Sequence, residues 1–261
     1  MLKKLLKYDL VYIYRCLYIL YGVAIFFSIL TRIFLNIDGA MIWTIIGKIC
    51  SGTLISMMIS IVMNNVLRLW ARFSTNFYSD ESYLTHTLPV NKSTLYAVKI
   101  MSALITMISS FLVILLSIVI AYYTKEKYEI FINTFIYKNG NIWDVLMIVL
   151  ILIIQMLCVT QVGYTGITLG NRRINLKIAF SFIYGFVTYA IAQAIMMVAI
   201  LLKALFDKDL RNVMFLAKNN MEPMDDTIKS LLCYAGIVYL IIFAITWIVN
   251  NKLFSKGVNV D

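Results

Sequence analysis

The sequence is poor in the residues on which soluble proteins depend. Of its 261 residues only 14% are charged, two are proline and one is histidine, whereas 62% are hydrophobic. Soluble chains contain about 25% charged and about 45–50% apolar residues. The composition therefore excludes an ordinary soluble domain and a disordered tail, and it indicates an integral membrane protein.

The residues that most catalytic and metal sites require are also scarce. A single histidine, His86, supplies neither an HExxH zinc site nor a Ser/His triad within the membrane. A phosphate-binding loop is absent, because Ile42 stands where its first glycine is needed and Ile49 follows Gly47-Lys48. The four cysteines lie in apolar runs without a CxxC pair, which favours small buried side chains. We expect no catalytic residue, no metal and no cofactor bound by this chain.

Charged residues divide the chain into six apolar windows. A helix needs about 20 apolar residues to cross a bilayer, and a membrane β-barrel would instead need segments that alternate apolar and polar residues. These windows are continuous, so helices are predicted. The sequence predicts one all-α membrane domain over residues 1–261, with spans at about 16–35, 42–67, 100–124, 143–169, 178–202 and 230–250.

The segment before the first window, residues 2–14, has an amphipathic pattern. Its leucines and Ile13 fall on one helical face, and Lys3, Lys4 and Lys7 fall on the other. This pattern predicts an interfacial helix that lies along the membrane surface. Asp9, at the edge of the apolar face, departs from it.

The distribution of basic residues gives the topology. Six spans put both termini on one side, and that side carries 13 Lys and Arg against 10 on the other. The bias favours cytoplasmic termini and outer loops at 125–144 and 203–229. The net charge of +10 is then explained by topology and by anionic lipid headgroups, without a nucleic-acid partner. Lys48, at the start of the second window, is expected to snorkel to the headgroups, the alternative being a place along a transport pathway.

Small polar residues form stripes within two of the windows: Thr53, Ser56, Ser60 and Asn64 in the second, and Ser181, Gly185 and Thr188 in the fifth. Two interpretations stay open. Small residues let helix backbones approach each other in lipid, and they can also line an apolar translocation route. Gln155, Gln161 and Gln193 should face protein or water, since a lipid-facing amide is costly.

The connection at residues 68–99 is the most informative segment. It carries aromatic and aliphatic side chains on a stretch that is too charged to insert, which is typical of a segment that docks on a protein. Ser79 can cap a short helix that begins at Asp80-Glu81, and Pro89 ends it. The side chains expected at a partner are Phe77, Tyr78, Asp80, Glu81, Tyr83, Leu84, Leu88 and Pro89.

The run FYSDESYLTHTLPVNKSTLYAVK resembles the loop between the second and third spans of bacterial ABC-exporter permeases of the six-helix, type-2 family. The family pattern is Ser-Asp-Glu-Gly-Tyr-Leu, then Thr-Leu-Pro, then a Lys that opens the third span. The matching residues here are Ser79, Asp80, Glu81, Tyr83, Leu84, Thr87, Leu88, Pro89 and Lys99. The start of the chain, Leu5 to Leu10 with Arg15, is also similar, whereas Ser82 replaces the usual glycine.

This resemblance implies a coupling helix that docks on a separate ABC ATPase subunit, where ATP and Mg would bind. It also implies a bacterial plasma-membrane exporter in which a second permease copy or paralogue completes the translocation route. Such permeases often export lantibiotics, bacitracin-like antibiotics or phenol-soluble-modulin toxins, so a hydrophobic or amphipathic peptide is the expected substrate. Two alternatives stay open: an ATPase-independent transporter or channel, and a non-transport sensor or immunity protein.

Overall fold

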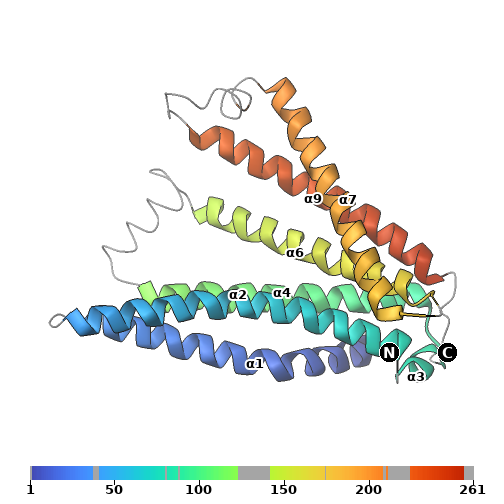
Figure 1. The fold of residues 1–261 in the computed structure, drawn as a ribbon, viewed down its shortest axis with the longest axis horizontal. Coiled ribbons are helices and arrows are strands. Elements are labelled where there is room, and N and C mark those ends of the chain that lie inside the picture. Colours follow the sequence, from blue (N-terminus) through green and yellow to red (C-terminus); the bar gives the residue numbers. More distant parts are fainter. Residues whose placement is uncertain are drawn as a thin grey trace. The chain divides into compact units, whose positions relative to one another are not determined.

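The computed structural model describes residues 2–37, 41–79, 81–87, 89–122, 142–173, 175–207, 210 and 224–255. Its helices are α1 (Leu2–Leu35), α2 (Met41–Tyr78), α3 (Ser82–Thr87), α4 (Lys92–Tyr122), α6 (Ile142–Gly170), α7 (Lys177–Phe206) and α9 (Met224–Ser255) (Figure 1). Within these ranges the chain forms no strand, and six helices are long and apolar enough to cross a membrane. The prediction of an all-helical chain with six membrane-spanning helices is confirmed at this level.

The helices extend beyond the apolar windows. The second helix continues past residue 67 to Tyr78, and the next long helix begins at Lys92 instead of residue 100. The predicted spans were apolar stretches and not helix ends, because a charged residue ends a membrane-inserted stretch but does not end a helix: Lys and Arg are good helix formers. The connection at 68–99 is therefore mostly helical, and α3 lies between the two long helices.

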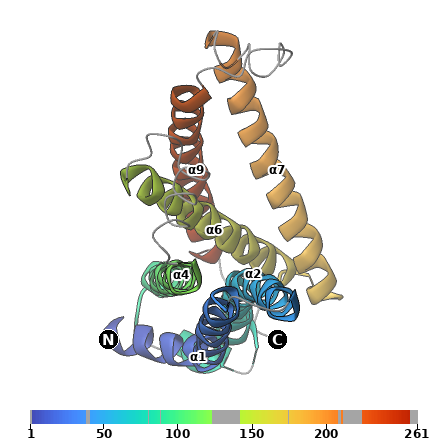
Figure 2. The same cartoon turned by 90° about the vertical axis from the view of Figure 1, so that its left-hand side faces the viewer.

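The amphipathic segment and the first span form one continuous helix, α1. Figure 2 shows the first turns of α1, beside the N-terminus, running sideways to the rest of the helix, which is viewed nearly end-on. The same first turns contribute buried side chains, among them Asp9 and Ile13. The segment thus packs against its own chain as well as presenting an outer face.

The chain divides into two compact units, Met1–Asn139 and Gly140–Asp261, and each contains three of the six long helices. In the first unit, α1 packs against both α2 and α4. Fully buried side chains there include Leu17, Leu54, Phe73 and Met107. In the second unit, α6 packs against both α7 and α9, around a core of Cys158, Met196, Ala235, Val238 and Ile242.

Candidate functional site

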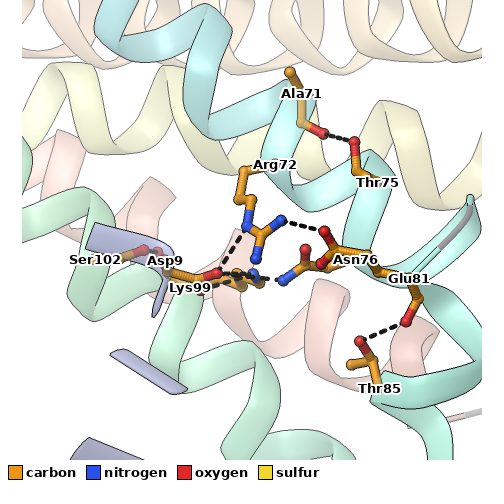
Figure 3. A network of polar contacts seen from close by, with 9 residues as sticks. All are labelled: Asp9, Ala71, Arg72, Thr75, Asn76, Glu81, Thr85, Lys99 and Ser102. Atoms are coloured by element: carbon orange, nitrogen blue, oxygen red, sulfur yellow. Dashed lines mark hydrogen bonds and ion pairs between the residues drawn. The ribbon is translucent and has the colours of Figure 1, made fainter. Parts of the chain in front are cut away.

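The carboxylate of Asp9 is the centre of a buried polar network in the first unit (Figure 3). Its Oδ1 accepts hydrogen bonds from Lys99 Nζ at 2.8 Å, Arg72 Nε at 3.1 Å and Asn76 Nδ2 at 3.2 Å. Its Oδ2 accepts from Lys99 Nζ at 2.7 Å. Arg72 and Asn76 lie in α2 and Lys99 lies in α4, so one carboxylate joins three helices.

The two cations of the network are compensated by charge and by aromatic rings. Lys99 is only 4% exposed, and a buried ion costs several kcal/mol unless it is paired with good geometry. Its ammonium lies 5.4 Å from the ring centroid of Phe77, and the guanidinium of Arg72 lies 4.7 Å from that of Tyr12. Aromatic faces attract cations, which adds to the pairing with Asp9.

The network continues to the start of α3. Arg72 Nη1 donates to Glu81 Oε1 at 2.9 Å, directly before the first residue of that helix. The Glu81 carbonyl accepts from the backbone N–H and from the hydroxyl of Thr85, both at 3.0 Å. The Ser82 N–H donates to the Ser79 carbonyl at 2.8 Å, so Ser79 contributes its backbone to the turn. These bonds connect α3 through Arg72 to Asp9.

The exposed face of α3 presents two adjacent apolar side chains. Tyr83 is 74% exposed and Leu84 is 68% exposed. Pro89, after the helix, is also exposed. Both α3 side chains are thus available to a partner protein. Two further residues expected at a partner, Asp80 and Leu88, lie outside the described residues.

The aromatic residues that end α2 lie differently from the prediction. Phe77 is fully buried and packs on Phe73, with ring centroids 5.0 Å apart. The ring of Phe77 lies under the ammonium of Lys99. Phe77 is therefore not available to a partner. Tyr78 is half-buried, with its ring 6.2 Å from that of Phe73. The sequence analysis did not predict that α2 reaches Tyr78. It therefore could not distinguish Phe77 and Tyr78, which pack within the chain, from the exposed Tyr83 and Leu84.

The polar stripe of the fifth span belongs to a helix-packing seam. A Cβ placed on Gly170 would lie 2.1 Å from Ser181 Oγ, and one on Gly166 would lie 2.6 Å from Gly185 Cα. Only glycine allows α6 and α7 this approach. Ser181 and Gly185 are consequently not free to line a route, and helix packing accounts for them. Thr188 donates to the Tyr184 carbonyl of its own helix.

The stripe of the second span has a different environment. Thr53, Ser60 and Asn64 are half-buried within the first unit, and Ser56 is exposed. Thr53 donates to the Ile49 carbonyl at 3.0 Å, and Asn64 donates to the Ser60 carbonyl at 2.9 Å. Each of these two side chains thus bonds to its own helix.

Gln161, predicted to face protein, is fully buried in the second unit and confirms that prediction. Its Oε1 accepts from the Thr246 hydroxyl, and its carbonyl accepts from Asn250 Nδ2 at 3.1 Å. Thr165 Oγ1 donates to Asn250 Oδ1 at 2.8 Å. This group, which we name the amide seam, joins α6 to α9 without a charged residue.

Sequence reasoning missed the Asp9 network. The available signal was Asp9 itself, because a carboxylate at the edge of an apolar face requires a buried cation. No protein-family model matches the chain, and neither does any curated protein or solved structure. The interpretation of the site therefore depends on its own geometry and on the residues at 77–99.

Proposed function

We propose that this chain is the membrane-spanning permease subunit of an ATP-driven ABC exporter. The observation that carries the proposal is the construction of α3. This short helix connects two long apolar helices, exposes Tyr83 and Leu84, and is bonded at its start to the Asp9 network. An exposed apolar pair on a fixed base suits a docking site for a partner. The resemblance of residues 77–99 to the coupling loop of such permeases supports an ATPase subunit as that partner.

The network gives the proposed coupling a physical route. A force on α3 reaches α2 through the pair of Glu81 and Arg72, and it reaches α1 and α4 through Asp9 and Lys99. Four hydrogen bonds hold the Asp9 carboxylate, so a displacement of Arg72 is transmitted to its neighbours instead of being absorbed by a loose side chain. ATP and Mg would bind in the partner, and this chain would act without catalytic residues.

The proposed assembly contains two permease chains, as two copies or as paralogues, in a bacterial plasma membrane with the termini in the cytoplasm. The first turns of α1 would lie along the inner surface of the bilayer. The small residues of α2, Thr53, Ser56, Ser60 and Asn64, remain the proposed lining of the route. Because these side chains are uncharged, a hydrophobic or amphipathic peptide is the substrate that suits them.

The docking role of α3 is tested by co-purification of an ATPase subunit that contains a phosphate-binding loop. The double variant Tyr83→Ala/Leu84→Ala should recover much less of it than the wild type. The loss of one aromatic anchor often costs about 2 kcal/mol, which is roughly a thirtyfold loss of affinity. The matched control is Leu205→Ala/Phe206→Ala, an adjacent exposed pair on α7 (68% and 88%), which should recover the ATPase normally.

The thermal stability of the permease without its partner separates docking from folding. We expect the Tyr83/Leu84 variant to melt like the wild type, because both side chains are exposed. Normal ATPase recovery by this variant would contradict the coupling role of α3. A lowered melting temperature together with normal recovery would assign both side chains to packing on the permease itself.

The orientation of α3 is tested by cysteine labelling in intact cells. If α3 meets a cytoplasmic ATPase, Ser255→Cys at the end of α9 should be protected from an impermeant reagent. Asn139→Cys, which lies outside the described residues, should be labelled from outside. The reverse pattern would place α3 on the wrong side of the membrane and would exclude the exporter assignment.

A further inference from the structure

The outer face of the first turns of α1 contains a groove of about 590 Å³. Three exposed basic side chains line it, those of Lys3, Lys7 and Arg15. Among the described residues, no acidic side chain lines the groove, because the carboxylate of Asp9 on this segment is buried in the network with α2 and α4.

The positive charge of this groove has no acidic partner in the part of the first unit that the structure describes. The ion pairs among the described residues all involve Asp9 or Glu81, and none involves Lys3, Lys7 or Arg15. Three cationic groups on one face of a surface helix therefore attract an anion from outside the chain. Juxtamembrane basic clusters attract anionic lipid headgroups by about 1 kcal/mol per residue.

The rest of the groove is apolar and has a fixed aromatic wall. Leu6, Leu10 and Val11 line the same groove as the basic residues, so the leucines and lysines of this segment are not confined to opposite faces as the sequence analysis predicted. Tyr14 donates to Ser109 Oγ of α4 at 2.8 Å and stacks on Tyr18 with ring centroids 5.2 Å apart. A free inorganic anion would leave this aliphatic surface exposed to water, whereas an acyl chain would cover it.

We propose that this groove binds one anionic phospholipid. The phosphate lies beside Lys3 and Lys7, which are about one helical turn apart, and an acyl chain crosses Leu10 and Val11 toward the tyrosine wall. Arg15, further along the helix, adds positive charge to the same groove. Because the same turns of α1 carry Asp9 on their inner side, a bound lipid also holds the helix that supports the ion-pair network. A ligand that binds only the folded protein raises its stability in proportion to the logarithm of ligand concentration. Binding should therefore raise the melting temperature of the protein.

The test uses the full chain in an uncharged detergent, titrated with dioleoylphosphatidylglycerol and monitored by native mass spectrometry and thermal unfolding. Dioleoylphosphatidylcholine and glycerol 1-phosphate serve as the zwitterionic and the tail-free probe. We expect one phosphatidylglycerol to be retained and to raise the melting temperature, and we expect both other probes to bind far more weakly.

The matched variants remove equal charge inside and outside the groove. Lys3→Gln/Lys7→Gln/Arg15→Gln should lose roughly a hundredfold in affinity, at about fivefold for each basic group. Lys4→Gln/Lys48→Gln/Lys92→Gln removes three exposed lysines that do not line the groove and should bind like the wild type. Val11→Trp keeps the charge but fills the groove at an exposed position, and it should also lose the lipid.

If the two triple variants lost equal affinity for phosphatidylglycerol, binding would depend on the total charge of the protein, and the proposed site would be wrong. If phosphatidylcholine bound with the same affinity as phosphatidylglycerol, the basic side chains would have no role in lipid recognition. Two results would show that the groove binds a simple anion and not a lipid. One is competition by glycerol 1-phosphate at the same concentration, and the other is unchanged phosphatidylglycerol binding by Val11→Trp.

Discussion

The two units of the chain hold three long helices together by different chemistry. In the first unit α1, α2 and α4 meet at a network of ionised side chains centred on Asp9. In the second unit α6 is joined to α9 by the amide seam and to α7 by close backbone approach at Gly166 and Gly170. The charged junction lies beside α3, so the unit with strong directional bonds is the one that carries the proposed docking helix.

The positions of the polar groups along the helices explain the difference. Asp9 is near the start of α1, Arg72 is near the end of α2, and Lys99 is near the start of α4. Helices that alternate in direction bring these positions to the same end of the unit, and a charge near the end of a membrane-spanning helix costs less than one at its centre. Gln161 lies in the interior of α6, where hydrogen bonds between uncharged side chains cost less than buried ion pairs.

The largest effect is expected when the ion-pair network loses its carboxylate. Asp9→Asn leaves Lys99 buried without a counter-charge, and breaking a buried pair in this way costs about 3–5 kcal/mol of unfolding free energy. Thermal unfolding in detergent measures the loss. The control is Asp9→Asn/Lys99→Met, which removes both charges and should be more stable than the single variant. A single variant as stable as the wild type would show that the network does not hold the three helices.

A smaller effect is expected at the glycine seam of the second unit. Gly170→Ala should separate α6 from α7, because its Cβ would meet Ser181 at 2.1 Å, and overpacking of this kind costs about 1–3 kcal/mol. Gly52→Ala is the matched control, since a Cβ there meets nothing within 4 Å. Equal melting temperatures of the two variants would contradict the close packing of α6 on α7.

The smallest effect is expected at the amide seam. Thr165→Val removes one hydrogen bond to Asn250, and bonds of this kind within membranes contribute about 0.6 kcal/mol on average. Thr188→Val, which removes only a bond to its own helix, is the control. A loss from Thr165→Val as large as that from Asp9→Asn would remove the contrast between the two units.

The sequence predicted the helices better than it predicted their contacts. Continuous apolar windows identified all six long helices, because hydropathy depends on composition within one segment. The apolar windows did not show where α2 ends or where α4 begins, since charged residues mark the limit of an apolar window and not the limit of the helix. The buried position of Phe77 follows from that longer α2 and was missed with it.

The ion-pair network required information that no single segment contains. Asp9, Arg72 and Lys99 are far apart in the chain, and only the packing of α1 against α2 and α4 brings them together. The pairing of Gly170 with Ser181 is similar, because small residues predict close packing but not the partner. Tyr83 and Leu84 were predicted to meet a partner because they are apolar side chains on a segment too charged to insert, and both are exposed in the structure.

The most direct test of the account is photo-crosslinking from α3 in the native membrane. A benzophenone amino acid in place of Tyr83 should trap an ATPase subunit that contains a phosphate-binding loop. The same group in place of Phe186 of α7, whose exposure is similar, should trap none (74% and 72% exposed). An ATPase adduct from position 83 alone is the result that the account predicts. The absence of that adduct, or an equal yield from position 186, would contradict the assignment of α3 as the docking helix.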